Sequence, residues 1–274
     1  MEVPALGTFV DSFETIITGD HTQLDENGDI LFIFKKNAIP QNLADLAWNT
    51  FYKVANQKND NRGLAAGLLP NGNAKQADKY GVTRGNVCRS NIVGFFDKPI
   101  IQDKKLFPGK SVCRLTAYNH KNPELFEKTI PFFQCINQVY KENAPVKWHA
   151  QYDRSRENHP ELLINDTVFS TVTCNYNWRT ACHVDNGDFI NGLGNLTVVG
   201  RPGAPPHTGG IIGFPKYNMG VDVQPRDVLL MNVHQVHGNT EITSGDRLSF
   251  VCYLRNGMHK CKYKVDGTKF FTSL

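Results

Sequence analysis

The sequence predicts an α+β domain that is mainly β, with a sandwich or jelly-roll core in its second half. At 274 residues the chain can bury one sizeable core, and β sandwiches or barrels of this length are often one domain. Helical spacing of apolar residues is confined to the first half, and short apolar β runs fill the second. With no internal repeat, we expect one domain over 1–274, with 1–160 as a helical, loop-rich flanking part and 161–274 as the core.

The flanking part is predicted to contain a strand, two helices and a long loop. Ile30–Phe34 is an apolar run entered from a turn, which is typical of a strand. Apolar residues recur at helical spacing over 41–57 and again over 124–140, where Pro131 would start or kink the helix. Between them, 59–91 is rich in Gly, Asn, Arg and Lys without a sustained period, so we expect a polar loop, and such long loops are usually functional or disordered.

The predicted core consists of short apolar runs separated by turn residues. Successive β runs at this spacing are typical of a sandwich or jelly-roll. They cover 168–173, 194–200, 210–214, 227–232 and 247–255.

Composition and charge are those of an ordinary globular protein. Hydrophobic residues make up 40%, and a net charge of +4 is too weak to identify a nucleic-acid binder by itself. The seven cysteines are scattered without a Cys-x-x-Cys pair, which argues against a disulfide framework and a structural zinc site and favours a reducing intracellular compartment. No basic, apolar leader and no long apolar stretch occurs, so we expect neither secretion nor a membrane span.

A metal-binding pattern lies within the predicted core. His183 and Asp185 are two residues apart, so in an extended backbone both side chains project from the same side. His237 follows the apolar run at 227–231. Two histidines and one carboxylate on one face of a metal leave the opposite face open for oxygen and a chelating cosubstrate, as in non-haem Fe(II) oxygenases. The pattern predicts an Fe(II) site at these three residues.

A binding site for the cosubstrate is predicted from Arg247 and Ser249. Arg247 lies ten residues after His237, at the start of an apolar run. A dicarboxylate whose ketoacid end is held by iron needs a cation and a hydroxyl at its far carboxylate, and arginine can bind that group with two parallel hydrogen bonds. We therefore expect 2-oxoglutarate at Arg247 and Ser249.

Each of these residues also has a plain structural explanation. A single histidine in a β protein is more often a hydrogen-bonded core or surface group than a ligand, and Arg247 follows a Gly-Asp turn pair. His234 competes with His237, but residues three apart face opposite sides of a strand, and His237 is preferred for its spacing to Arg247 and for the room beside Gly238. We expect His207, in a Pro/Gly loop, to be exposed or near the mouth of the site.

Longer motifs around these residues resemble the TET/JBP oxygenases, which oxidise the 5-methyl group of pyrimidines in nucleic acid. The likeness covers about 60–255 and is closest to compact fungal, protist or viral members; the zinc-binding extension of large animal members is not carried over. It is carried by Asn61–Gly67, Ser90–Asp97, Arg179–Asp188, Gly192–Val199, Arg226–Leu230 before His237, and Arg247–Ser249.

The resemblance implies a double-stranded β-helix (jelly-roll) core with flanking N-terminal helices, and roles for individual residues. Iron would be held by the His183, Asp185 and His237 set, with 2-oxoglutarate at Arg247. Asp188, five residues after the first ligand, would accept from the amino group of cytosine, which suits a carboxylate. Tyr253 would stack on a flipped base. Relatives that act on methylcytosine tend to have a base-contacting histidine where this chain has Arg255, a departure that bears on the choice of base.

Some of these residues have alternative explanations. Asp188 also fits a turn cap, and Tyr253 also fits a core-facing strand residue. Arg62, Arg84, Arg89 and Asn91 lie in the polar loop, where they would contact DNA phosphates, enter the base pocket or simply be solvated. Asn91 is a candidate substrate contact. Arg179 is expected near substrate or cosubstrate, or at the surface beside Trp178.

The function expected from these features is Fe(II)- and 2-oxoglutarate-dependent oxidation of the 5-methyl group of a pyrimidine in DNA, with O2 as oxidant, 5-methylcytosine favoured and thymine the alternative. The base would be flipped out of the duplex. Two other readings share these residues: hydroxylation of a protein side chain or small molecule, and a non-catalytic jelly-roll binding module. We expect an intracellular monomer without membrane contact, nuclear in a eukaryote.

Overall fold

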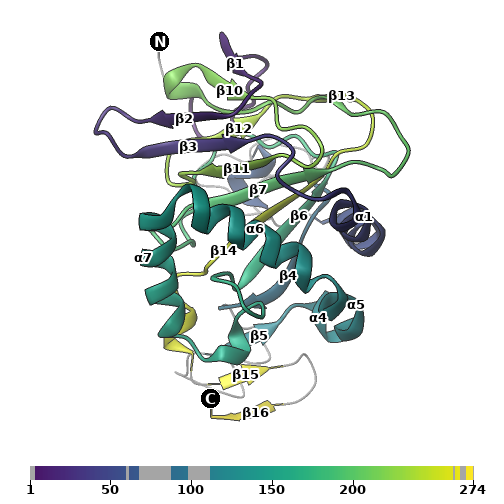
Figure 1. Cartoon of the computed structure of the whole chain (residues 1–274), viewed down its shortest axis with the longest axis vertical. Coiled ribbons are helices and arrows are strands. Elements are labelled where there is room, and N and C mark those ends of the chain that lie inside the picture. Colours follow the sequence, from purple (N-terminus) through teal and green to yellow (C-terminus); the bar gives the residue numbers. More distant parts are fainter. Residues whose placement is uncertain are drawn as a thin grey trace, which may run out of the picture.

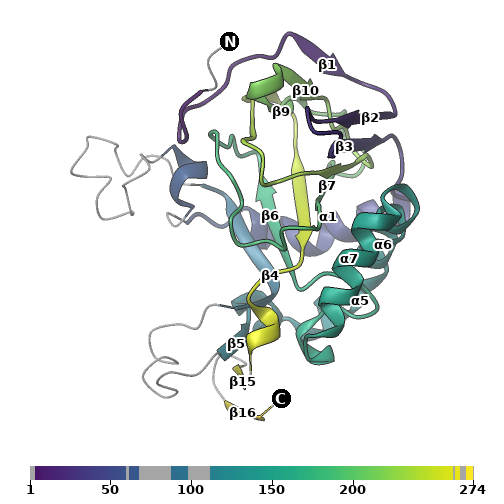
Figure 2. The ribbon, with the colours of Figure 1, turned by 90° about the vertical axis from the view of Figure 1, so that its left-hand side faces the viewer.

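The computed structural model describes residues 4–59, 62–67, 88–97, 112–261, 263–265 and 270–273. Within them the chain forms three layers: a large β-sheet in the middle, helices on one face of it and a small sheet on the other (Figures 1 and 2). The structure is thus mostly β with a helical layer, as the sequence predicts at this level.

The large sheet has ten strands in the order β16-β15-β5-β4-β6-β14-β7-β11-β3-β2. Its centre is antiparallel, with β14 between β6 and β7. The bounds are β2 His21–Leu24, β3 Ile30–Lys35, β4 Ser90–Phe96, β5 Val112–Leu115, β6 Thr171–Tyr176, β7 Gly194–Val199, β11 Val228–Met231, β14 Leu248–Tyr253, β15 Tyr263–Val265 and β16 Phe270–Ser273.

The small sheet has four strands in the order β1-β10-β9-β12. Strands β8 and β13 form a separate two-stranded sheet. The pairing of β1 with β10 is parallel and brings the N-terminal segment onto the second half of the chain. The bounds are β1 Thr15–Ile17, β8 Thr208–Gly209, β9 Ile212–Phe214, β10 Met219–Val221, β12 Gly238–Asn239 and β13 Ile242–Ser244.

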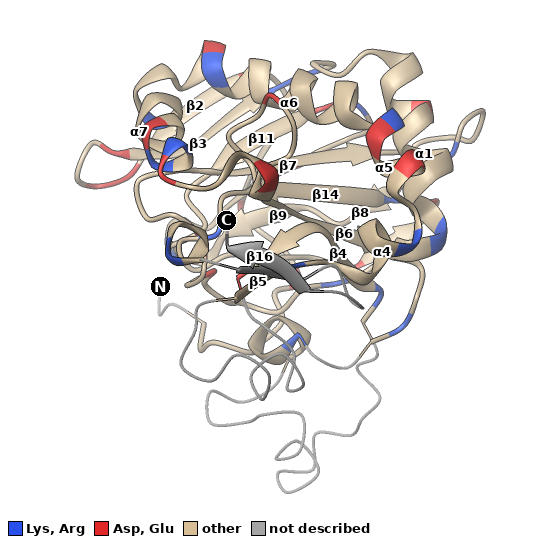
Figure 3. Ribbon diagram, turned by 90° about the horizontal axis from the view of Figure 1, so that it is seen from below, with Lys and Arg blue, Asp and Glu red and all other residues tan. Residues whose placement is uncertain are grey.

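The helical layer covers one face of the large sheet (Figure 2). Both acidic and basic residues occur along its helices (Figure 3). Its α-helices are α1 Gln41–Ala55, α4 Ala117–Lys121, α5 Pro123–Lys128, α6 Ile130–Asn143 and α7 Pro145–Arg156. Single 3-10 turns are η1 Gly63–Ala66, η3 Pro160–Leu162, η4 Pro215–Tyr217 and η5 Met258–Lys260.

Two apolar clusters hold the three layers together. The cluster under the helices contains large aromatic side chains, such as Phe51, Phe133 and Phe250. The centroid of the Phe51 ring lies 5.8 Å from that of Phe133 and 5.5 Å from that of Phe250. The cluster between the sheets includes Phe32 from β3 stacked on Phe214 from β9 at 5.8 Å. Burial of each such side chain contributes about 1.5–3 kcal/mol, so both faces of the large sheet stabilise the fold.

The predicted helix over 41–57 is confirmed as α1, and the one over 124–140 is two helices. The break falls at Thr129, whose hydroxyl donates to the Phe126 carbonyl at 2.6 Å, and Pro131 occupies the first turn of α6. Proline suits that position because its missing N–H would be unpaired there. α7 was not predicted because its exposed Val146 and polar composition weaken the apolar period.

The five predicted core runs all contain strands, although the run at 168–173 begins three residues before β6. β2, β3, β4 and β5 come from the flanking part of the chain and pair into the same sheet. Within the predicted polar loop, the described residues form η1 and the start of β4, and Arg84 lies outside the described residues.

One disulfide was not predicted. Cys113 of β5 and Cys261 after η5 are bonded, with their Cα atoms 5.6 Å apart. The two residues are 148 apart in sequence, a spacing that no local cysteine pattern reveals. Among the described residues, no helix is both long enough and apolar enough to cross a bilayer.

Candidate metal centre and substrate pocket

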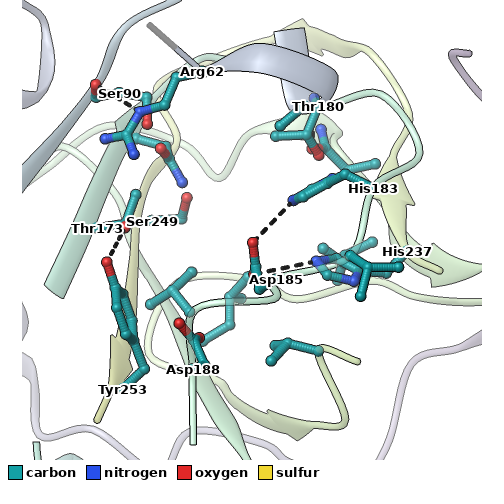
Figure 4. Close-up of a pocket in the computed structure, with 18 of the residues that line it drawn as sticks. Arg62, Ser90, Thr173, Thr180, His183, Asp185, Asp188, His237, Ser249 and Tyr253 are labelled. Carbon is teal, nitrogen blue, oxygen red and sulfur yellow. Dashed lines mark hydrogen bonds and ion pairs between the residues drawn. The ribbon is translucent and has the colours of Figure 1, made fainter. Parts of the chain in front are cut away.

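Three predicted metal ligands come together at one end of a pocket. His183 and His237 face each other across an isolated antiparallel bridge, with reciprocal backbone hydrogen bonds of 3.0 and 3.1 Å. The Asp185 carboxylate lies beside both rings, with Oδ1 3.7 Å from His183 Nε2 and Oδ2 3.7 Å from His237 Nε2. The three possible ligand atoms lie within 4.8 Å of one another, which suits a single ion (Figure 4).

Backbone contacts fix the orientation of both imidazoles. His183 Nδ1 lies 2.7 Å from the Ala181 carbonyl, and His237 Nδ1 lies 3.0 Å from the Gln235 carbonyl. If Nδ1 carries the proton and donates, each Nε2 keeps a lone pair toward the other ligands, which is the tautomer that a metal requires. Burial and the neighbouring His183 lower the pKa of His237 to about 4, so its ring is neutral at pH 7. His234 instead directs Nε2 toward the Phe189 carbonyl, 3.4 Å away.

Arg247 is a buried cation with unused donors. Its side chain is 3% exposed, and Nη1 donates to Ser249 Oγ at 3.2 Å, whereas Nε and Nη2 have no hydrogen-bond partner among the described residues. Burial lowers the pKa of Arg247 to about 10, which still leaves it charged at neutral pH. Both residues line the same pocket as the triad. Unpaired buried donors of this kind fit an anionic ligand.

His207 is buried, contrary to the expectation that it would be exposed or near the mouth. It is 2% exposed, and neither ring nitrogen has a partner in the described part of the chain. Burial, with Arg247 nearby, lowers the pKa of His207 to about 3. Its backbone packs so closely on Gly245 that a Cβ there would lie 2.8 Å from the His207 Cα.

The pocket between the triad and Arg247 has a volume of about 360 Å³, enough for a small ring system. Tyr253 and Asp188 both line it and are each 8% exposed. Tyr253 meets Thr173 through their hydroxyls at 3.2 Å, and Figure 4 shows it across the pocket from the two histidines. Burial and the Asp185 charge raise the pKa of Asp188 well above its ordinary value.

Comparison with known proteins identifies the family. The Tet_JBP model, described as the oxygenase domain of the 2OGFeDO superfamily, matches residues 100–256. The chain belongs to the Tet_JBP family.

Curated relatives support this assignment to Tet_JBP. The "Bifunctional helicase and thymine dioxygenase JBP2" of Trypanosoma brucei brucei is 31% identical over 255 residues, covering 90% of this chain and 21% of the relative. The "Thymine dioxygenase JBP1" of the same organism is 31% identical over 199 residues, covering 70% of this chain and 22% of the relative. The chain thus spans about a fifth of the length of these relatives.

A solved structure of NgTET1 in complex with 5mC DNA has a similar fold. The TM-score is 0.57 at 14% sequence identity, with 95% of this chain and 88% of that chain covered. At this identity the likeness concerns the fold of the Tet_JBP domain alone.

Two predicted substrate contacts do not line the pocket of this Tet_JBP domain. The Asn91 amide donates to the carbonyls of Val54 and Gln57 at 2.7 and 2.8 Å, so it holds the end of α1 to β4. Arg179 donates to the Val10 carbonyl at 2.6 Å and pairs with Asp11, which fixes the N-terminal segment. Neither side chain lines the pocket, because each has structural partners elsewhere, and a contact with substrate outside the pocket stays a prediction for both.

Other residues reach the pocket from distant parts of the sequence. Arg62 lines it and directs Nε to the Ser90 carbonyl at 3.2 Å, whereas Arg89 lies over the Tyr176 ring, 5.8 Å away. Arg255 also lines the pocket, and its Nε donates to Asp97 at 3.0 Å. From the sequence, Arg255 stands out only as a departure from relatives, and no role is predicted for Asp97. Their contact depends on strand order rather than on local spacing.

Proposed function

We propose that this chain is an Fe(II)- and 2-oxoglutarate-dependent dioxygenase that oxidises the 5-methyl group of a pyrimidine in DNA. One observation carries the proposal: a His-Asp-His set and a buried arginine with unused donors line the same pocket. The family supplies the cofactor class, and the relatives named above are thymine dioxygenases. The overall reaction converts a methyl group, O2 and 2-oxoglutarate into a hydroxymethyl group, succinate and CO2.

The proposed iron ligands are His183, Asp185 and His237. The donor set of two imidazole nitrogens and one carboxylate is the one that non-haem Fe(II) sites use, and both histidines have Nδ1 engaged by backbone carbonyls. When bound, Fe(II) supplies O2 activation coupled to decarboxylation of 2-oxoglutarate. The protein contributes three ligands on one side and leaves the pocket side free.

Arg247 and Ser249 are proposed to bind the far carboxylate of 2-oxoglutarate. The free Nε and Nη2 of Arg247 would donate to its two oxygens, and the Ser249 hydroxyl lies 3.2 Å from Nη1 beside them. The carboxylate compensates the buried guanidinium, so cosubstrate binding removes an unpaired charge from the core. This anchors the cosubstrate with its ketoacid end toward the triad.

The remaining space is proposed to hold the base. Tyr253 offers a ring for stacking, and its hydroxyl is held by Thr173 at 3.2 Å. Asp188 lies three residues from the metal ligand Asp185, so it would face the base edge next to the methyl group. A duplex base reaches such a pocket only after unstacking, which costs about a few kcal/mol. Asp188 as an acceptor suits 5-methylcytosine, whereas the neighbouring Arg255 is a donor and suits thymine.

The proposal extends to the fold, the oligomeric state and the location of the chain. The two facing sheets would form a double-stranded β-helix, or jelly-roll, with the metal site between β12 and the segment before β7. The chain would act on DNA as a monomer, in the nucleus of a eukaryotic cell. These statements rest on the resemblance of the site to its family and on the DNA-modifying names of the relatives.

The deciding experiment measures two products. The chain is incubated with Fe(II), 2-oxoglutarate and DNA containing thymine and 5-methylcytosine, and nucleosides are analysed by mass spectrometry alongside succinate. We expect hydroxymethylated base with matching succinate, and neither with Asp185→Ala. Succinate without any oxidised base would reject the DNA substrate and favour a protein or small-molecule oxygenase.

A separate measurement distinguishes an enzyme from a binding module. Anaerobic addition of Fe(II) and 2-oxoglutarate should produce a weak visible charge-transfer band, and His183→Ala should abolish it. Asp166→Ala, at an exposed turn, is the matched control and should keep the band. Absence of the band in the unaltered chain would support the non-catalytic alternative.

A further inference from the structure

A buried cluster of three charged side chains forms one wall of the pocket. Arg255 Nε donates to Asp97 Oδ1 at 3.0 Å, and Arg255 Nη1 lies 3.8 Å from Asp188 Oδ1. All three side chains are 9–12% exposed. The guanidinium also lies over the Phe96 ring, 4.8 Å from its centroid, so it is held by an aromatic face as well as by Asp97.

Sheet topology explains why Asp97 meets Arg255. β4 and β14 are both antiparallel to β6, which lies between them, so both strands end at the same edge of the sheet. Gly94 and Tyr253 are each paired with Thr171. Asp97 and Arg255 follow these positions by three and two residues, and the Arg255 backbone N–H is held by Ser170 Oγ at 3.0 Å.

Two glycines make room for this cluster. A Cβ on Gly187 would lie 1.7 Å from Arg255 Nη1, and a Cβ on Gly257 would lie 2.4 Å from Asp97 Oδ2. Side chains at either position would therefore displace the guanidinium or the carboxylate. The chain thus has glycine at both places where the contact between Asp97 and Arg255 needs space.

The contact with Asp97 engages Nε of Arg255, and both Nη atoms lie beside Gly187, which also lines the pocket. The separation of 3.8 Å from Asp188 exceeds a hydrogen bond, and within the described residues no acceptor is hydrogen-bonded to either Nη. The pair of Asp97 and Arg255 is close to charge-neutral, so the Asp188 carboxyl is the excess acid of the cluster. Its raised pKa agrees with a carboxyl that Arg255 compensates only weakly.

We propose that Asp97 is a positioning residue for base selection: it holds Arg255 so that an Nη N–H points at the 4-position of the bound pyrimidine and favours a 4-oxo base over a 4-amino base. The inference rests on the proposed function. With the methyl group directed at the triad, one neighbouring ring position is C6, which carries only hydrogen, and the other is C4. The polar wall of Asp188 and Arg255 therefore faces C4, where thymine has an acceptor and 5-methylcytosine has a donor.

Asp97→Asn tests this with almost no change in shape. The amide that replaces the carboxylate does not compensate the charge of Arg255, so the guanidinium is drawn toward Asp188. The N–H that would face the base then donates to the Asp188 carboxylate instead. The assay uses one duplex containing both bases and measures the ratio of 5-hydroxymethyluracil to 5-hydroxymethylcytosine. We expect the ratio to fall by about tenfold or more, the size of one oriented hydrogen bond in base discrimination.

Two further variants separate positioning from stability. Gly257→Ala displaces Asp97 without removing its charge and should lower the same ratio, and Asp166→Asn makes the same chemical change at an exposed turn and should leave it unchanged. KM for 2-oxoglutarate and the visible Fe(II) band should not change in any of the three. These readouts would move if Asp97 only held the fold together.

The outcomes are distinct. A parallel loss of both oxidised bases in Asp97→Asn, with their ratio unchanged, would overturn the positioning role. An increase of the ratio would overturn it as well, because Arg255 would then favour the amino base. If the unaltered chain oxidises neither base, the proposed function itself fails, and this is recognised before any variant is compared.

Discussion

Arg247 is the residue on which the proposed binding of 2-oxoglutarate depends most. It is a guanidinium in the core, with Nε and Nη2 unpaired among the described residues and Ser249 beside Nη1. An unpaired buried charge is strongly destabilising, whereas a carboxylate that accepts two parallel hydrogen bonds compensates it. Affinity for 2-oxoglutarate should therefore depend on the forked shape of this side chain as well as on its charge.

Arg247→Lys should raise KM for 2-oxoglutarate by about tenfold or more, because lysine keeps the charge but cannot donate two parallel hydrogen bonds. Succinate formation measured against cosubstrate concentration gives this value. Arg201→Lys is the matched control, since Arg201 pairs with Asp246 at 2.9 Å but is more than half exposed. Equal KM values in both variants would show that Arg247 does not hold the carboxylate.

At the scale of elements, strands and helices were predictable where one period dominates locally. α1 shows this, because its buried residues recur at helical spacing from Ala44 to Ala55. The proximity of His183 and Asp185 was predictable for the same reason, because residues two apart project from one side of an extended segment. The contact of Asp97 with Arg255 was not, because it arises only from β4 and β14 flanking β6. The position of Asn91 outside the pocket was not predictable either, because its sequence neighbours do not reveal the carbonyls at the end of α1.

The pairing of β4 with β6 depends on Gly94. Its φ is +90°, and a Cβ there would lie 2.6 Å from the Ser170 carbonyl oxygen. Gly94→Ala should therefore lower the free energy of unfolding by about 2–4 kcal/mol, from backbone strain and from the displaced strand together. Urea unfolding followed by circular dichroism measures the loss.

Gly28→Ala measures the cost of backbone strain alone, without a steric clash of the added Cβ. Gly28 has a φ of +83°, yet a Cβ there would meet nothing within 4 Å. Its cost should be about 1 kcal/mol, because only the left-handed conformation is strained. If the two variants lose equal stability, the close approach of β4 to Ser170 contributes nothing.

Across the whole molecule, the pocket draws on parts of the chain far apart in sequence. Arg62 directly precedes η1, the triad comes from segments before β7 and after β11, and Arg255 follows β14 by two residues. Fold and site are therefore coupled, because loss of either sheet disperses the pocket. The sequence predicted the layers in outline, but it could not reveal which polar residues the packing would bury, and His207 is the clearest case.

His207 links the stability of the molecule to pH. Its pKa is about 3 in the folded chain, against an ordinary value of 6.5 when exposed. Between these values the unfolded chain binds a proton that the folded chain does not, so stability falls as pH decreases through this range. At pH 5 the expected contribution of His207 to this loss, relative to pH 7.5, is about 2 kcal/mol, from 1.36 kcal/mol per pH unit below 6.5.

His207→Leu should remove this loss, so that its free energy of unfolding changes less than that of the unaltered chain between pH 7.5 and pH 5. His149→Leu is the matched control, since His149 is exposed on α7 and should keep the original pH dependence. Urea unfolding at both pH values decides the matter. His237, whose pKa is about 4, should still contribute an acid loss in His207→Leu, so only an acid loss as large as that of the unaltered chain would place the responsible protonation elsewhere. Because His207 lies near Arg247, the cosubstrate carboxylate should reduce the same loss in the unaltered chain by compensating Arg247 and stabilising a charged imidazole beside it.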